Sequence, residues 1–173
     1  MFLVTDSIET RQRKIRQFLR RGEPAIAVLL AAADCERTMR RAILSLGTTP
    51  TRELAHRLGR KRPKGYVAPA PTPPHYGSSI KGYAKAWKQE VSPFWGLELK
   101  GDVIEDWDSL AKAFQLRHDL IHGDTGTTGQ DYAEVQVEAL LAATERVHKA
   151  AFDRGYDLEK PLRRRLRPRA KAK

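Results

Sequence analysis

The sequence predicts an all-α protein, a helical bundle built around two long core helices. Apolar residues recur at helical spacing over residues 23–46 and again over the stretch that ends at residue 122, as expected of amphipathic helices. We find no stretch that alternates apolar and polar residues as a half-buried strand does. With 173 residues, 40% of them hydrophobic and 31% charged, the chain is long enough for one domain with a core and short for two.

The first part of the chain is predicted to form three helices. A charged helix over residues 6–21 has few apolar positions, so we expect it to pack on one side only. The helix over residues 23–46 carries a much stronger pattern, with Pro24 suited to its first turn and Gly47 to its end. A short helix over residues 52–58 follows.

A proline-rich stretch then interrupts the helices. Residues 59–79 contain five prolines together with Gly65 and Gly77. No helix interior or central strand tolerates this composition. We expect a long surface loop here, inserted into a single helical domain that spans residues 1–158.

Further helices are predicted in the second half. One covers residues 80–91 and is followed by an irregular aromatic turn at residues 93–97. The next begins at residue 102 or 106 and runs to residue 122, where Gly123 ends it. Its apolar stripe is expected to consist of Trp107, Leu110, Ala111, Phe114 and Ile121.

The last long helix is predicted to begin with a capping box. Asp131 is followed three residues later by Glu134. At this spacing the side chain of the N-cap residue and that of the later acid each accept a hydrogen bond from the other residue's backbone N–H. We expect the helix to follow a Gly- and Thr-rich loop at residues 124–130 and to end near residue 154. Its core face is expected to consist of Val135, Ala139, Ala142, Ala143, Val147 and Ala150.

Positive charge is concentrated at the C-terminus. The formal net charge is +11, and residues 159–173 hold eight Lys or Arg against one acid, so they contribute +7 and the domain +4. We expect a basic, disordered tail over these residues that binds RNA without sequence preference, or is solvated without a ligand. Candidate RNA contacts are Arg163, Arg164 and Arg165 in the tail and Arg60, Lys61 and Arg62 in the loop.

Cysteine usage and hydropathy predict the compartment. Cys35 is the single cysteine, so it has no internal disulfide partner, and its place in an apolar run predicts packing. No run reaches the roughly 18 apolar residues that a membrane span needs, and charges follow directly after a short apolar N-terminus. We therefore expect a cytoplasmic protein that has no membrane partner.

The most informative stretch is Arg-His-Asp-Leu-Ile-His-Gly at residues 117–123, the end of a predicted amphipathic helix. At about 100° and 1.5 Å per residue, Arg117 and His122 lie roughly 140° apart around the helix and about 7.5 Å apart along it. They therefore converge poorly within one chain. His118 and His122, four residues apart, share a face.

This stretch resembles the R-x4-6-H motif of HEPN domains, which are small dimeric all-α proteins, many of them metal-independent ribonucleases. The polar residue after the arginine, here His118, and the position at a helix end belong to the resemblance, which covers about residues 23–154. The resemblance implies a homodimer in which two helix ends meet and each supplies Arg117 and His122 to a composite site. We also expect a toxin, defence or stress setting, with an antitoxin or regulatory protein as partner.

The residue types of the motif suit RNA cleavage. RNA carries its own nucleophile in the 2′-hydroxyl, so the protein must supply a proton acceptor that titrates near neutrality, and His122 is the candidate. Arg117 is suited to the negative charge that develops on the phosphorane. His118 or Asp119 is the candidate to orient the base. The resemblance implies a 2′,3′-cyclic phosphate product and no cofactor.

Glu36 is the supporting residue expected on the preceding long helix. On a helical wheel it falls in the middle of the apolar stripe, where an ionised carboxylate needs a partner. HEPN domains similarly place a polar or acidic residue there, facing the motif, so Arg117 or His118 is one expected partner. Arg40, four residues further on, is the other.

Other interpretations of the motif stay open. Arg117 can be structural, and His122 can stabilise the helix end without a catalytic role. His118 and His122 have the spacing of a metal-binding pair, but the sequence shows no convincing third ligand, so no metal is expected. Asp124 stands where toxins of the family commonly carry a tyrosine, which leaves regulation by tyrosine modification unsupported. The alternative function is a non-catalytic HEPN-like dimeric module that binds RNA, a nucleotide or a protein partner.

Overall fold

The fold is all-α, as the sequence predicts. The computed structural model of the chain describes residues 6–59, 74–77, 79–123 and 127–169. Over these ranges it holds seven helices and no strand, and its β structure is limited to an isolated bridge between Lys100 and Ile104. Most of the predicted loop at residues 59–79, including Arg60, Lys61 and Arg62, lies outside the described residues.

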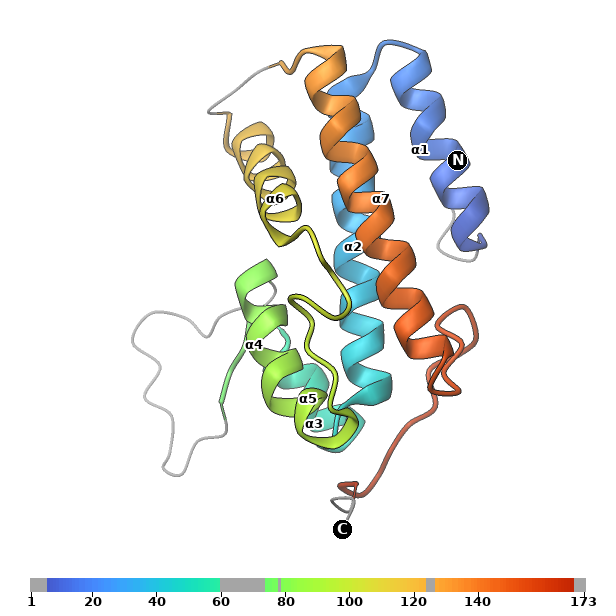
Figure 1. The fold of residues 1–173 in the computed structure, drawn as a ribbon, viewed down its shortest axis with the longest axis vertical. Coiled ribbons are helices and arrows are strands. Elements are labelled where there is room, and N and C mark those ends of the chain that lie inside the picture. The colour runs from blue at the N-terminus through green and yellow to red at the C-terminus, as the bar shows by residue number, and fades with distance from the viewer. Residues whose placement is uncertain (1–5, 60–73, 78, 124–126, 170–173) are drawn as a thin grey trace.

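Two long helices form the centre of the bundle. The helices are α1 (Ile8–Arg20), α2 (Pro24–Leu46), α3 (Thr51–Arg57), α4 (Ile80–Glu90), α5 (Ser92–Trp95), α6 (Trp107–His122) and α7 (Gln130–Phe152). In Figure 1, α2 and α7 lie side by side and run in the same direction, while α1 and α6 run the opposite way. The short helices α3, α4 and α5 gather around the end of α2 (Figure 1). Since α2 contacts α1, α3, α4, α6 and α7, it is the central helix.

The bounds of α2 agree with the prediction, but its end has another cause. Pro24 occupies the first turn and Gly47 follows the last residue. Gly47 has an ordinary φ of −58° rather than a left-handed one. A Cβ there would lie 2.6 Å from Leu54 Cδ2 and 2.7 Å from the Ile43 carbonyl oxygen. Glycine fits here because the Ile43 carbonyl of α2 and the Leu54 side chain of α3 leave no room for a Cβ.

The interior of α2 holds the only cysteine of the chain. Cys35 is fully buried beside other fully buried residues of the helix, such as Met39 and Ile43. Burial raises the pKa of the Cys35 thiol to about 12. The predicted packing role of Cys35 is confirmed.

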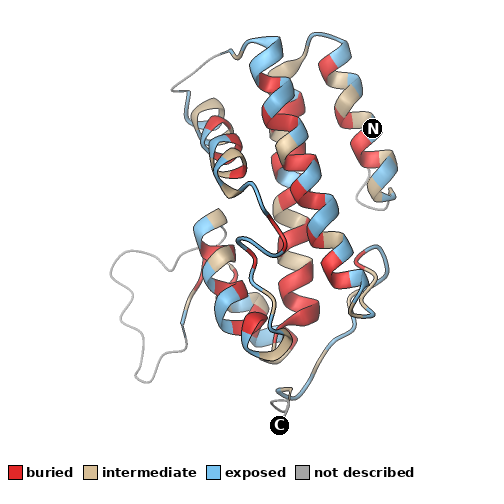
Figure 2. Ribbon diagram, viewed as in Figure 1, coloured by how far each residue is buried: buried red, intermediate tan, exposed pale blue. Residues whose placement is uncertain are grey.

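The buried face of α7 differs from the predicted one. Ala143, Val147 and Ala150 are buried as predicted, but Val135 is 62% exposed and Ala142 is also exposed. The buried positions include Val137, Leu140 and Leu141 instead. Figure 2 shows that buried and exposed positions alternate along α7. The prediction followed a run of alanines, whereas burying the larger leucines removes more apolar surface from water.

The predicted capping box of α7 is wrong. The N-cap residue is Gly129, and no side chain caps the helix. Asp131 lies in the first turn instead, where its negative charge interacts favourably with the helix dipole. The helix starts at Gln130. The side-chain amide of this residue donates a 2.8 Å hydrogen bond to the Leu19 carbonyl at the end of α1.

Helix α6 carries the motif and has clear signals at both ends. The Asp106 side chain caps it by accepting a 3.0 Å hydrogen bond from the Ser109 backbone N–H. Gly123 ends it with a left-handed φ of 76°, a conformation that favours glycine. Leu110 and Phe114 are buried as predicted, but Ile121 is 50% exposed, so the apolar stripe stops short of the helix end.

Two expected surface segments pack against the body of the protein. Tyr76, at the described end of the proline-rich stretch, is only 7% exposed, so this stretch is not entirely a surface loop. In the C-terminal tail, the Arg165 backbone N–H donates to Thr51 Oγ1 at 2.9 Å and the Thr51 N–H donates to the Arg165 carbonyl at 3.0 Å. The tail is thus placed along the start of α3, which differs from the expected disordered tail. Arg163 and Arg164 are exposed.

The sequence predicts no membrane-spanning segment, and the described helices agree with this. None of them combines the length and the apolar character that crossing a bilayer requires.

Candidate functional site

The motif residues lie on the last two turns of α6, at the edge of a cavity. The cavity has a volume of about 390 Å³ and lies between α2, the beginning of α4 and α6. Its described lining consists of Glu36, Ser79, Ile80, Lys81, Ala111, Phe114, Gln115, Arg117 and His118. The fold therefore brings three of the predicted site residues, Glu36, Arg117 and His118, to one cavity.

Glu36 pairs with Arg117 across two helices. Arg117 Nη2 lies 3.7 Å from Glu36 Oε2, and their side chains are 32% and 21% exposed. Arg40 instead donates hydrogen bonds to the carbonyls of Leu58, at 2.6 Å, and Ala55, at 3.1 Å. The prediction that Glu36 faces the motif is confirmed, and of the expected partners the structure selects Arg117.

The environment of the pair changes its titration. Burial raises the pKa of Glu36, and the nearby Arg117 charge offsets only part of that effect. The pKa of Tyr83 is raised as well, first by burial and then by the negative charge of Glu36. Tyr83 is 3% exposed on α4, so this hydroxyl belongs to the buried side of the site. Tyr83 is not among the site residues predicted from the sequence, because nothing in its spacing reveals the neighbouring carboxylate.

The two histidines form an adjacent pair on the exposed side of α6. The ring centroids of His118 and His122 are 4.2 Å apart with a tilt of 46°, which confirms that they share a face. Both are exposed, and the described cavity lining includes His118 but not His122. Within one chain, Arg117 therefore reaches inward to α2 while His122 stays on the surface beside His118.

Asp119 has a different partner from the expected one. Its Oδ1 accepts a 2.6 Å hydrogen bond from the Gln115 side-chain amide, one turn earlier on α6. Its carbonyl oxygen accepts the hydrogen bond from Gly123 N–H that closes the helix. The structure thus pairs Asp119 with Gln115 and the helix end rather than with a histidine.

The beginning of α4 adds positive potential that the sequence analysis did not identify. Lys81 lines the cavity from the first turn of α4. Ser79 caps the helix by accepting a 3.1 Å hydrogen bond from Gly82 N–H. The remaining N–H groups and the helix dipole favour an anion at this end. The serine cap is a recognisable sequence signal, but its position beside Arg117 depends on the tertiary fold.

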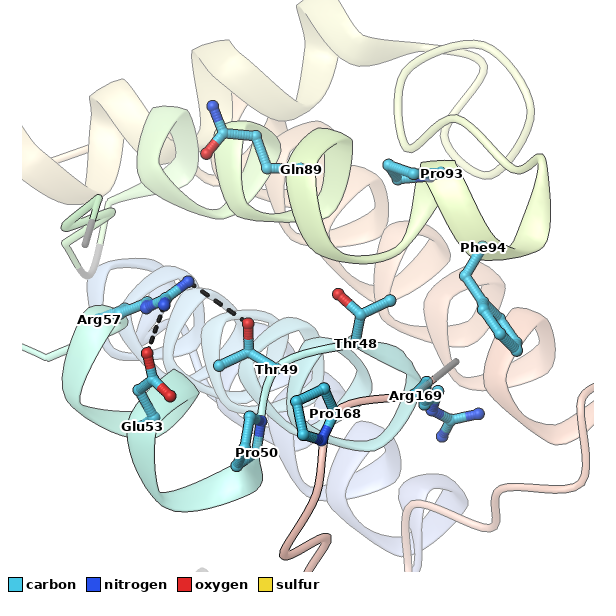
Figure 3. Close-up of a pocket in the computed structure, with 10 residues that line it drawn as sticks. All are labelled: Thr48, Thr49, Pro50, Glu53, Arg57, Gln89, Pro93, Phe94, Pro168 and Arg169. Atoms are coloured by element: carbon cyan, nitrogen blue, oxygen red, sulfur yellow. Dashed lines mark hydrogen bonds and ion pairs between the residues drawn. The ribbon is translucent and has the colours of Figure 1, made fainter. Parts of the chain in front are cut away.

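A larger cavity lies at the other end of the bundle, away from the motif residues. It has a volume of about 490 Å³ and includes Arg57, Phe94 and Arg169 in its lining (Figure 3). Arg57 is held by ion pairs with Glu53 and Glu90 and by a 3.3 Å hydrogen bond to Thr49 Oγ1. Because none of its lining residues belongs to the motif, we assign the candidate site to the cavity beside the motif.

No family model, no curated protein and no solved structure matches the chain. The resemblance to HEPN domains therefore rests on the residues of the motif and their position at the end of α6.

Proposed function

We propose that the protein is a HEPN-like, metal-independent endoribonuclease that acts as a homodimer. The proposal is carried by one observation, the Glu36–Arg117 pair at a cavity that also receives His118, with His122 adjacent to it. Cleavage would proceed by attack of the RNA 2′-hydroxyl on the neighbouring phosphate and leave a 2′,3′-cyclic phosphate and a 5′-hydroxyl.

The charges of the cavity suit a phosphodiester. Arg117 is a permanent cation whose planar guanidinium presents two parallel N–H donors to phosphate oxygens. Lys81 and the beginning of α4 add positive potential on the facing wall. Glu36 pairs with the guanidinium, so its proposed role is to position Arg117. The proposed base, His122, lies where solvent and substrate can reach it.

Dimerisation is part of the catalytic proposal. Arg117 and His122 diverge within one chain, so a composite site takes the arginine from one protomer and the histidine from its partner. Exposed apolar residues at the end of α6 and the beginning of α7 support association there: Ile121 is 50%, Tyr132 52% and Val135 62% exposed. A toxin, defence or stress setting in the cytoplasm, with an antitoxin or regulatory partner, completes the proposal and rests on the resemblance alone.

Cleavage of a mixed RNA pool in EDTA tests the activity. We expect cleavage by the wild type, loss in Arg117→Ala and in His122→Ala, and retention in the surface control His56→Ala. Products ending in a cyclic phosphate support the mechanism. If wild-type protein that is folded and dimeric leaves RNA intact, the enzyme proposal is lost.

A mixed dimer tests the composite site separately. In a dimer of Arg117→Ala with His122→Ala, the composite site keeps one arginine from one protomer and one histidine from its partner. Random mixing makes about half of the dimers mixed, so up to about half of the wild-type activity should return. No recovery in a proven mixed dimer contradicts a site shared between protomers. RNA binding without cleavage by every variant favours the alternative, a non-catalytic binding module.

A further inference from the structure

A second group of ligand-type side chains lies at the end of α7, outside the motif cavity. His148 on α7 and Asp157 and Glu159 in the segment after it place one ligand atom each within 4.8 Å of one another. Within the described part of the chain, no other group of three or more histidine, cysteine or carboxylate side chains brings its ligand atoms this close together. None of its members lines the motif cavity.

The imidazole of this group has an unused nitrogen. Nε2 of His148 is buried and has no hydrogen-bond partner among the described residues. The ring stacks on Phe152, one turn further along α7, with centroids 6.5 Å apart and an angle of 17°. An unpaired polar atom in a buried position is costly, and such atoms in native proteins call for a missing partner. A ligand that accepts the nitrogen lone pair would supply one.

The two carboxylates are held together by the local backbone. Asp157 Oδ1 accepts a 2.9 Å hydrogen bond from the Glu159 backbone N–H, which fixes the turn between them. Glu159 Oε1 accepts a hydrogen bond from Ile8 N–H, so the group also contacts the beginning of α1.

We propose that His148, Asp157 and Glu159 bind a divalent zinc ion. One imidazole nitrogen and two carboxylate oxygens are a donor set that zinc accepts, whereas Ca²⁺ and Mg²⁺ prefer oxygen ligands alone. Three protein ligands leave a fourth position for water. The ion would join the end of α7, the segment after it and the beginning of α1, and thus act as a structural clip.

Two cations that pair with the carboxylates leave the site accessible. Lys160 Nζ lies 3.4 Å from Asp157 Oδ2, but its side chain is 76% exposed and free to turn into solvent. Arg11 Nη1 lies 3.8 Å from Glu159 Oε1, but its Nε is bound to Asp34. This proposal departs from the sequence expectation of no metal, which rested on the lack of a convincing third ligand for the His118–His122 pair. It is independent of the proposed ribonuclease activity.

Calorimetric titration of the full chain with zinc chloride, after removal of metals, tests the site. We expect one zinc ion per chain in the wild type, and affinity at least about tenfold weaker in His148→Gln and in Asp157→Asn. The matched control is the double variant His118→Gln/His122→Gln, which removes the other histidine pair and should keep wild-type affinity. Zinc should also raise the midpoint of thermal unfolding in the wild type and in this control, but not in His148→Gln.

Circular dichroism of each variant in EDTA checks that it folds, and Asp157→Asn provides the second reading if His148→Gln is unfolded. Absence of zinc binding by the wild type overturns the proposal. Binding that survives both His148→Gln and Asp157→Asn, or that is lost only in the control variant, overturns it as well.

Discussion

Arg11 and Asp34 form an ion pair in the interior of the protein. Arg11 Nε lies 2.7 Å from Asp34 Oδ1, and the two side chains are 5% and 0% exposed. The pair joins α1 to α2, and Asp34 Oδ2 is buried with no hydrogen-bond partner among the described residues. Burial raises the pKa of Asp34 although Arg11 and Arg37 counteract it. A charge this deep depends strongly on its partner.

Replacing Arg11 with methionine should therefore destabilise the protein severely. Breaking a buried pair from one side leaves an uncompensated charge, which typically costs about 3–5 kcal/mol in the free energy of unfolding. Urea unfolding followed by circular dichroism measures the loss. The double variant Arg11→Met/Asp34→Leu should recover most of it, because both charges are gone. A wild-type midpoint in the single variant contradicts the prediction.

The loss in Arg11→Met should also depend on pH. The pKa of Asp34 is raised in the folded state, so the folded protein binds this proton more tightly than the unfolded chain does. Ionisation of Asp34 therefore lowers the free energy of unfolding as the pH rises from the pKa of the unfolded chain, about 3.9, through the pKa of the folded protein. The deficit of the variant should be larger at pH 7 than at mildly acidic pH, and a constant deficit argues against Asp34 as its source.

Glu90 should contribute stability through its ionised form. Its carboxylate accepts hydrogen bonds from Thr48 Oγ1, Thr49 N–H and Oγ1, Arg57 and the Tyr76 hydroxyl, at 2.9–3.1 Å. Burial alone would raise the pKa of Glu90, but these hydrogen bonds outweigh it and the pKa is lowered. We expect Glu90→Gln to lower the free energy of unfolding by about 1.5–3 kcal/mol at pH 7.

The sign of the pH dependence follows from that lowered pKa. The stability that ionised Glu90 contributes is fully present above the pKa of the unfolded chain, about 4.3. It is lost as the pH falls through the pKa of the folded protein. Urea midpoints of wild type and Glu90→Gln should therefore converge in acid. A difference that persists unchanged there indicates that lost packing, not charge, destabilises the variant.

Replacing Glu36 with glutamine should stabilise the protein at pH 7, whereas Glu90→Gln should destabilise it. The pKa of Glu36 is raised by burial, so ionised Glu36 opposes folding above the unfolded value of about 4.3. Glu36→Gln should raise the free energy of unfolding at pH 7 by about 0.5 kcal/mol, and the gain should shrink in acid. Under the proposed function, the same variant should cleave RNA more slowly because Arg117 loses its support. Destabilisation at pH 7 would show that the Arg117 pairing outweighs burial.

Neighbouring arginines of the tail should differ sharply in their contribution to stability. Arg165 donates to the Thr49 carbonyl from Nε at 3.1 Å and to the Ser45 carbonyl from Nη1 at 3.3 Å, whereas Arg164 is exposed. We expect Arg165→Ala to lower the free energy of unfolding by about 1–3 kcal/mol and the matched control Arg164→Ala to change it by less than about 0.5 kcal/mol. Equal thermal midpoints for the two variants contradict the placement of the tail.

Local signals in the sequence were sufficient for the main helices and for narrowing one contact of the site. Pro24 and Gly123 mark helix ends because their backbone chemistry acts within a few residues. The helical wheel predicts that Glu36 needs a partner, because an ionised acid on an apolar stripe is costly, but it leaves Arg117, His118 and Arg40 as candidates. The packing of α6 against α2 selects Arg117.

Features that depend on tertiary packing were not predictable in the same way. The wider buried face of α7 is set by α1, α2 and α6 together. The Arg11–Asp34 pair and the burial of Tyr83 beside Glu36 join residues that are ordinary in their own segments. His148 and Asp157 are separated by a helix end, so no regular spacing connects them.

The complete burial of Cys35 makes the folded chain inert towards thiol-directed labels, since its thiol is inaccessible and resists ionisation. A cysteine introduced at the exposed position Lys112 on α6 would thus be the sole reactive thiol. In the proposed homodimer, a spin label attached there would be present once per protomer, and the distance between the two labels would report how the two α6 helices are oriented in solution.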